Sequence, residues 1–190
     1  MPMVFGNPKT LAIESSITEP YEQLSQLALG YFVIVVGDKS FGVKAPDATL
    51  LSCSYYAVKE RLERRGTHSV SFESDSDPIK IVDAYLASVY QDNRQNETFF
   101  GLSSNDFSEE IHSKNIVWAP DGDQAFDDGS HVLQFDIGNK VRLIAFKNEG
   151  KLEEVIPTMS ETWLSSDEYY STLQEWLKAF DTEREKALAR

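Results

Sequence analysis

The most hydrophobic stretch of the chain is residues 31–36, Tyr-Phe-Val-Ile-Val-Val, which lies between two glycines. No side chain in this run is charged, so a strand built from it is suited to burial on both faces. Residues 37–40 have turn-forming character, and residues 41–43 resume the apolar pattern. The pattern therefore predicts a strand at the centre of a sheet, joined to a hairpin partner by a loop of about four residues.

Apolar residues at helical spacing predict further elements. In residues 55–65 they recur at i, i+3 and i+7, with Ser54 as the expected N-cap and Gly66 ending the helix. A second helix is expected to open at Asp77 and Pro78, an N-cap followed by proline at the first helical position. Its apolar stripe continues to Tyr90, which indicates an amphipathic helix with one buried face.

The remaining helical segments begin at capping residues. Ser103 and Asp106 have the spacing of a capping box and predict a short helix. The same spacing links Ser165 and Glu168, ahead of a broad apolar face that ends at Phe180. Residues 182–190 are mostly charged, and we expect them to fray into solvent.

Strand patterns occupy both halves of the chain. The expected strands are residues 11–13, 31–36, 41–43, 49–51, 116–118, 131–136, 141–147 and 152–156, and residues 1–9 are expected to be a leader containing a turn. The last three form an antiparallel meander. The sequence therefore predicts an α+β fold, with an antiparallel sheet of two hairpin or meander regions packed with about three helices in one domain spanning residues 1–190.

Size and composition agree with this class. A chain of 190 residues with 41% hydrophobic content can bury a core without a metal or a disulfide. Its single cysteine, Cys53, cannot form an internal disulfide and is expected to be a small buried residue. No apolar run approaches about 18 residues, and no secretory signal is present, so we expect a cytoplasmic protein.

The acidic charge is concentrated in one part of the chain. The net charge is -13, which disfavours nucleic acid and anionic membrane surfaces as partners. Residues 73–136 hold 14 acidic and 3 basic residues, a balance of -11. Even spreading would serve solubility, whereas concentration permits a surface that steers a basic protein into contact.

The loop at residues 121–129 is the strongest candidate for chemistry. It contains Asp121, Asp123, Asp127 and Asp128, but an EF-hand would need different residues at Ala125, Phe126 and Val132. Three interpretations remain open: a solvated turn, a contact for a cationic partner, and the metal site of a hydrolase. The three histidines lack metal-ligand spacing, and no nucleophile elbow, phosphate-binding loop or dinucleotide motif is present. No cofactor or metal is predicted.

Several stretches together resemble a known family. They are residues 5–8 with 11–14, 42–49 with 65–68, 117–123 with 126–130, 141–146 and 173–176. The chain resembles the immunity protein 42 family of bacterial polymorphic-toxin systems over nearly its whole length. The resemblance implies a small cytoplasmic antitoxin that is not an enzyme, and that binds the C-terminal domain of a secreted toxin and blocks its active site.

The leading hypothesis is therefore a toxin-neutralising protein with a basic protein partner. The candidate contact residues are Asp121, Asp123, Asp127, Asp128, Glu73, Asp75 and Asp77, with Trp118 and Phe126 as apolar anchors. Both aromatic residues could equally belong to the core. The alternatives are a metal-dependent hydrolase that uses the carboxylates of residues 121–128, and an acidic adaptor for basic peptides. The sequence does not set the oligomeric state.

Overall fold

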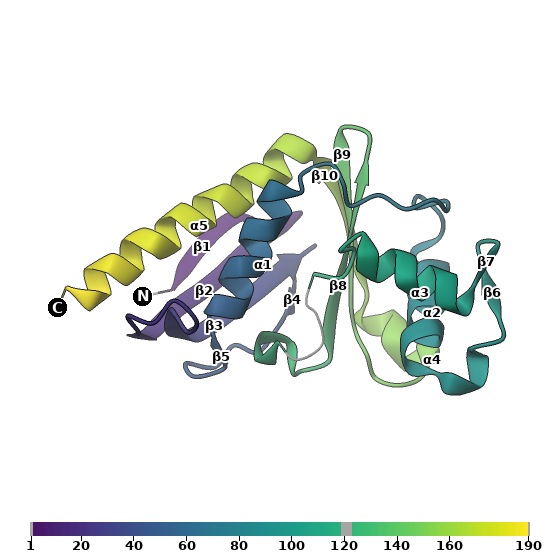
Figure 1. Ribbon diagram of the computed structural model, residues 1–190, viewed down its shortest axis with the longest axis horizontal. Coiled ribbons are helices and arrows are strands. Elements are labelled where there is room, and N and C mark those ends of the chain that lie inside the picture. The colour runs from purple at the N-terminus through teal and green to yellow at the C-terminus, as the bar shows by residue number, and fades with distance from the viewer. Residues whose placement is uncertain (1, 119–122, 190) are drawn as a thin grey trace.

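In the part of the chain that the structure describes, two larger antiparallel sheets, a separate two-stranded hairpin and the helices around them form the molecule (Figure 1). The computed structural model describes residues 2–118 and 123–189. The larger sheet has the strand order β1-β2-β3-β4, with β5 also paired to β3, and the smaller has the order β10-β9-β8. The predicted α+β class is confirmed.

The larger sheet is built around β3, as the hydrophobic run predicted. Its strands are β1 (Met3–Asn7), β2 (Leu11–Pro20), β3 (Ala28–Val36), β4 (Lys39–Phe41) and β5 (Thr49–Leu50). Every residue from 30 to 36 is buried. The β3–β4 turn has two residues, Gly37 and Asp38, with φ of 56° and 65°. Positive φ at both positions suits a tight hairpin turn, so the connection is shorter than the four residues expected.

Residues 1–9 were expected to be a leader, and that interpretation is wrong for most of them. Met3–Asn7 form β1, which pairs antiparallel with residues 11–15 of β2. The turn indicated by Asn7 and Pro8 does exist, but it joins two strands. Because β2 is ten residues long, its second half extends beyond the start of β1.

The smaller sheet forms a wall between two cores. Its strands are β8 (Ser130–Ile137), β9 (Lys140–Lys147) and β10 (Ser160–Ser165). In β8, Val132 faces the first core, whereas Leu133 and Phe135 face the second. Leu143 and Ile144 divide in the same way in β9. The β8–β9 hairpin therefore has two buried faces, and alternate residues along each strand enter different cores.

The third strand of the meander lies later in the chain than predicted. Residues 152–156 are not a strand: they form helix α4 (Leu152–Val155) and the start of the 3-10 turn η3 (Ile156–Thr158). The apolar spacing i, i+3, i+4 in this stretch is helical, and Glu153 and Glu154 occupy the first turn, where the helix dipole favours anions. The strand that pairs with β9 is β10.

The longer helices begin where local capping predicted. They are α1 (Ser52–Glu63), α2 (Pro78–Tyr90), α3 (Ser104–Ser113) and α5 (Ser166–Leu188), and the small elements are η1 (Asp92–Arg94), η2 (Gln124–Phe126) and the β6–β7 hairpin (Thr98–Phe99 with Leu102–Ser103). The side chains of Asp77, Ser103 and Ser165 accept the expected N-terminal amides. Helix α1 instead starts at Ser52 without a side-chain cap, so Ser54 lies inside it.

The C-terminal helix is longer than predicted. Residues 182–190 were expected to fray, yet α5 continues to Leu188. Arg184 explains the difference, because its guanidinium donates to the carbonyls of Leu27 at 2.9 Å and Glu22 at 3.2 Å. These bonds tie the last turns to the loop between β2 and β3. None of the helices described here has the length and hydropathy needed to cross a bilayer.

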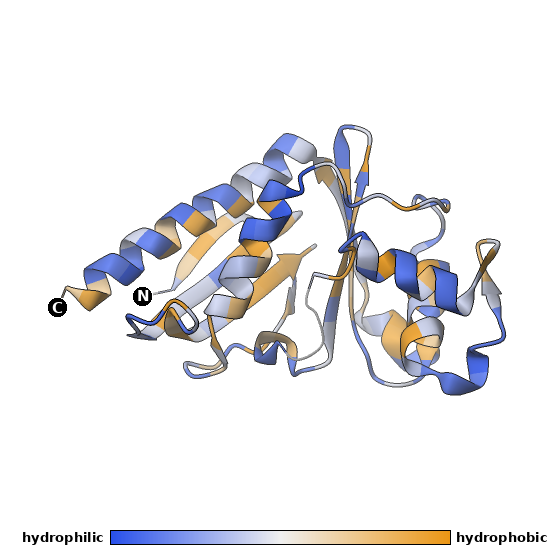
Figure 2. Cartoon of the chain, in the orientation of Figure 1, coloured by the Kyte–Doolittle hydropathy of each residue, from blue (hydrophilic) through white to orange (hydrophobic). Residues whose placement is uncertain are grey.

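The two cores lie on opposite sides of the wall. The first packs α1 and α5 against the larger sheet, and α5 presents its apolar stripe inward (Figure 2). The second packs α2, α3 and α4 against the smaller sheet. We call these three helices with the β6–β7 hairpin the helical lobe. Cys53, expected to be buried, is exposed in the first turn of α1.

Candidate functional site

The aspartates of the 121–128 loop are not equivalent. Asp121 lies outside the described residues. Asp123 is 7% exposed and accepts hydrogen bonds from the Ala125 amide at 2.9 Å and the Thr49 hydroxyl at 3.5 Å. Burial raises the pKa of Asp123. This side chain is occupied in holding the η2 turn, so the structure does not present it to a partner.

Asp128 also has a structural partner, whereas no hydrogen bond or ion pair of the Asp127 side chain is present among the described residues. Burial acts to raise the pKa of Asp128, but the bonds from Lys147 Nζ at 2.7 Å and the Ser130 amide at 3.2 Å lower it overall. Asp127 is exposed. Of the described aspartates in this loop, Asp127 is therefore the one available for contact.

The two aromatic candidates belong to the first core. Trp118 is 2% exposed, stacks 5.9 Å from the Phe32 ring and donates its indole N–H to Tyr169 at 2.7 Å. Phe126 is 7% exposed and meets Phe32 edge to face. Burial of both rings agrees with the core interpretation and leaves neither ring available as a surface anchor.

The other predicted acidic group, Glu73, Asp75 and Asp77, is exposed in the loop before α2. A buried arginine binds the backbone of this loop. Arg142 of β9 is 1% exposed and donates to the carbonyls of Ser74 and Ser76, each at 2.7 Å. The carboxylates therefore extend from a fixed backbone, which reduces the entropy lost when a partner binds.

The same arginine supports an exposed tryptophan that sequence reasoning missed. Trp163 of β10 lies opposite Arg142 across the β9–β10 pair and is 39% exposed. The Arg142 guanidinium lies 5.3 Å from the Trp163 ring centre, and both residues donate to Glu161 Oε1, at 2.8 Å and 2.9 Å. Strand alternation in residues 160–165, with Thr162 and Leu164 buried, was the available clue.

Arg142 thus joins an aromatic side chain to an acidic loop. We call Glu73, Asp75, Asp77, Glu161 and Trp163 the Trp163 surface. A half-exposed tryptophan among carboxylates combines the residue type that most often dominates interface energy with a field that favours cations. This arrangement suits contact with a basic protein surface.

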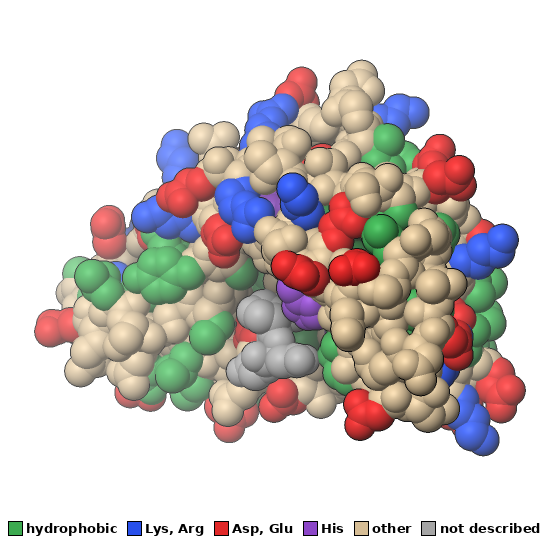
Figure 3. All heavy atoms as spheres, turned by 45° about the vertical axis from the view of Figure 1, so that its right-hand side comes forward, with side chains coloured by type: hydrophobic (Ala, Val, Ile, Leu, Met, Phe, Trp, Pro, Cys, Tyr) green, Lys and Arg blue, Asp and Glu red, His purple; other side chains and the backbone are tan. Residues whose placement is uncertain are grey.

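The other carboxylates of residues 73–136 do not form one continuous patch. Asp83 and Glu97 both pair with Arg94, and Asp136 accepts a hydrogen bond from the Tyr170 hydroxyl at 2.9 Å. Acidic side chains lie at separated places on the face shown in Figure 3. Charge that is concentrated in the sequence is therefore spread over the helical lobe, β8 and the η2 turn, and ion pairs neutralise part of it.

A buried polar network connects the two sides of the first core. Arg61 of α1 donates to Gln134 at 2.8 Å and to the carbonyls of Val117 at 2.6 Å and Asn115 at 3.0 Å. Tyr169 donates to the same Gln134 oxygen at 2.5 Å. Burial raises the pKa of Tyr169, so its hydroxyl stays protonated and can donate. These bonds join α1, β8 and α5 within the first core, so the network serves to order the fold.

His68 lies beside this network and makes stability depend on pH. Its Nδ1 is 3.1 Å from the carbonyls of Lys114 and Asn115, so Nδ1 carries the hydrogen. Its buried Nε2 has no hydrogen-bond partner among the described atoms. Burial and the charge of Arg61 lower the pKa of His68, against an opposing effect of Asp136.

We therefore expect acid to destabilise the protein through His68. The unfolded residue titrates near pH 6.5 and the folded one lower, so its contribution is present above about pH 6.5 and is lost as the pH falls through the folded pKa. Thermal unfolding from pH 7.5 to 5.5 should show a shallower decline for His68→Asn than for the wild type. His112→Asn, at an exposed histidine, should retain the wild-type slope. Equal slopes in all three proteins would contradict this assignment.

The described residues contain no group of three or more His, Cys, Asp or Glu side chains arranged to hold a metal ion. Of the carboxylates that the hydrolase hypothesis needed, Asp123 and Asp128 are engaged in protein contacts. The geometry thus gives that hypothesis no support, and it favours the Trp163 surface as the candidate functional site.

Comparison with known proteins adds a family and a fold. Residues 3–179 match the family described as Immunity protein 42. Among solved structures, the crystal structure of CdiI from Burkholderia dolosa AUO158 is similar, with a TM-score of 0.55 and 17% sequence identity, covering 93% of this chain and 99% of that chain. At this identity the likeness shows a shared fold. A search of curated proteins found no match.

Proposed function

Since the chain belongs to the immunity protein 42 family, we propose that it neutralises a bacterial toxin by binding the toxin's C-terminal domain and blocking its active site. The family match, which covers residues 3–179, is the observation that carries this proposal. The solved CdiI structure, a protein of the same fold, supports it. The protein acts by occupying its target in the cytoplasm, and it transforms no substrate.

The Trp163 surface is the proposed contact for a basic toxin domain. The net charge of -13 favours approach of a cationic partner. The exposed Glu73 and Asp75 belong to the loop that Arg142 holds, and the same arginine contacts the Trp163 ring. Asp127 is proposed as a further contact. Asp123, Asp128, Trp118 and Phe126 have structural contacts, and we do not propose them as direct contacts of the toxin.

Co-expression tests the function directly. The C-terminal domain of the toxin encoded beside this chain should arrest growth when produced alone, and this chain should restore growth and co-purify with it. An inactive toxin variant serves as the control for expression. Growth arrest that persists when both proteins are soluble, with no complex recovered, would refute the proposal.

Charge removal at the Trp163 surface should slow association. We expect the double variant Glu73→Gln/Asp75→Asn to reduce the association rate constant about tenfold at low salt and to flatten its salt dependence, because steering by these charges is lost. Asp77 is left intact because it caps α2. Stopped-flow or surface-plasmon kinetics measure the rate.

The matched control is Glu22→Gln/Asp47→Asn, which removes two exposed charges outside this surface. Both double variants change the net charge equally, so a difference between their association rates is due to the position of the removed charges. Equal association rates for the two would exclude the loop before α2 from the contact.

A further inference from the structure

Strand β1 has an open edge without the usual protection. It ends the larger sheet and pairs with β2 on one side alone among the described residues. Its sequence, Met-Val-Phe-Gly-Asn, has neither charge nor proline, and Val4 is 55% exposed. Soluble proteins normally protect sheet edges with such residues, because an open edge is a template for another strand.

Two other edges, those of β4 and β8, differ from that of β1. Strand β4 carries Lys39, whose ammonium binds the carbonyls of Pro157 and Met159. The free side of β8 is covered by residues 116–118, through bonds such as Trp118 N–H to the Val132 carbonyl at 2.8 Å. The edges of β4 and β8 are therefore protected, whereas that of β1 is open among the described residues.

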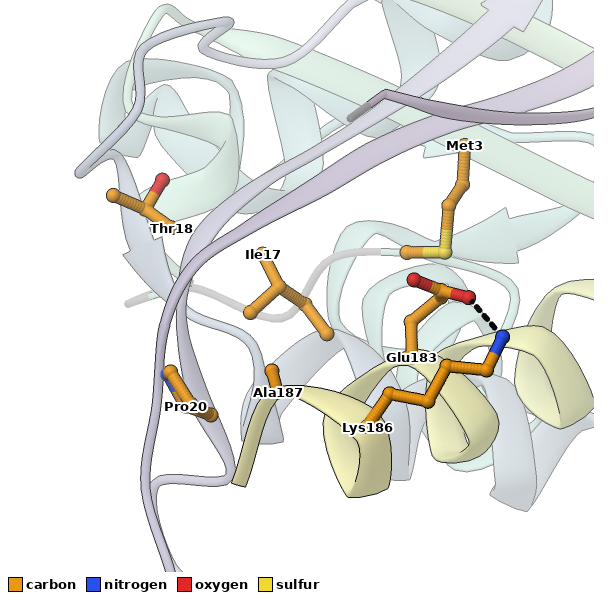
Figure 4. A pocket seen from close by; sticks show the side chains of 7 residues that line it. All are labelled: Met3, Ile17, Thr18, Pro20, Glu183, Lys186 and Ala187. Carbon is orange, nitrogen blue, oxygen red and sulfur yellow. Dashed lines mark hydrogen bonds and ion pairs between the residues drawn. The ribbon is translucent and has the colours of Figure 1, made fainter. Parts of the chain in front are cut away.

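A groove runs beside this edge along α5. One cavity of about 160 Å³ lies where Met3 and Ile17 face Glu183, Lys186 and Ala187 (Figure 4). A second, of about 340 Å³, lies between Phe5 and the helix. A third, shallower depression of about 230 Å³ continues along α5 toward Ser171 and is lined by helix residues alone. The helix residues that line them form one stripe: Ser171, Gln174, Glu175, Lys178, Ala179, Thr182, Glu183, Lys186 and Ala187.

The groove has the dimensions of an extended peptide. From Ser171 to Ala187 the helix rises roughly 24 Å, which matches about seven residues of extended chain. Met3 and Phe5 are alternate residues on the same face of β1, so alternate side chains of an added strand would lie over the two cavities they line. Main-chain pairing would supply affinity and the cavities would supply specificity.

We propose that β1 and α5 bind an extended segment of the cognate toxin domain, which adds to the larger sheet as a strand. The inference rests on the proposed function. A second copy of this chain is the less suitable occupant, because two molecules of net charge -13 repel each other, whereas a basic toxin is attracted. The positive charges of the lysine side chains that line the groove equal the negative charges of its glutamates, so the groove does not repel a cationic segment.

Hydrogen–deuterium exchange of the complex tests the pairing. The toxin domain encoded beside this chain is the probe. In the complex, the amides of residues 3–7 that face away from β2 should become protected relative to the free protein. A complex that leaves these amides unprotected would overturn the inference while leaving the proposed function intact. Failure to form any complex would overturn both, and protection that appears in the free chain with rising concentration would identify a second copy as the occupant.

A groove-filling variant gives an independent measurement. Ala179 lines the cavity beside Phe5, and Ala179→Arg should raise the dissociation constant at least tenfold by filling it. Asn105→Arg makes the same charge change on the exposed face of α3 and should stay within twofold of the wild type. Circular dichroism should show both variants folded. Wild-type affinity in Ala179→Arg would contradict the inference.

Discussion

Replacing Arg61 with alanine is expected to lower the free energy of unfolding by about 3–4 kcal/mol, through lost packing and unpaired acceptors. Arg61 is 1% exposed, and its guanidinium lies 4.7 Å from the Trp118 ring centre in addition to its bonds to Gln134 and the Val117 carbonyl. The substitution removes the connection from α1 to β8 and to the segment at residues 115–117. For a protein of this size the melting temperature should fall roughly 10 °C, measured by thermal or urea unfolding.

Two further variants distinguish the loss of packing from the loss of hydrogen bonds. Arg61→Met keeps most of the side-chain volume without its donors and should fall between alanine and the wild type. Arg64→Ala removes the arginine at the C-cap of the same helix, one paired at the surface with Glu60, and should cost under about 1 kcal/mol. If Arg61→Ala were as stable as Arg64→Ala, the buried network would not be a major source of stability.

Truncating Trp163 should have the largest effect on partner binding. We expect Trp163→Ala to weaken the toxin complex by about 2 kcal/mol or more, roughly 30-fold in the dissociation constant, since aromatic residues at interface centres lose most on truncation. Its half-exposed ring contributes little to the cores, so the melting temperature should change by a few degrees at most. Calorimetric titration with the inactive toxin domain measures the affinity.

The control is Leu24→Ala, which removes a hydrophobic side chain that is 67% exposed in the loop between β2 and β3. It should bind as the wild type does. A Trp163→Ala protein with unchanged affinity would remove the Trp163 surface from the proposed interface, while the co-expression result would still decide the function.

Local chemistry made much of the fold predictable. Asp77 and Ser165 cap helices through side-chain bonds to amides two or three residues away, so neighbouring residues alone specify these starts. The long apolar run could only be a central strand. Residues 152–156 show where prediction from local sequence fails, because a short apolar group fits both a strand and a helical turn. Packing into the second core decides between the two.

The candidate site was less predictable, because it depends on contacts between distant residues. Nothing near Glu73 in the sequence indicates that Arg142 holds its loop, and nothing near Trp163 indicates that its ring shares that arginine. Asp123 and Asp127 are four positions apart, yet one is buried and the other exposed. The sequence identified the acidic stretch and the family. The structure was needed to distinguish carboxylates that bind within the protein from those exposed for contact with a partner.

The wall formed by β8 and β9 limits how far this protein can be trimmed. Residues such as Leu133 and Leu143 face different cores. Removing the helical lobe would therefore expose the apolar side chains on one face of the hairpin to water, and removing the larger sheet would expose those on the other face. A minimal toxin-binding fragment therefore cannot be obtained by truncation. An engineered inhibitor based on this scaffold has to keep the intact chain and vary its outer residues.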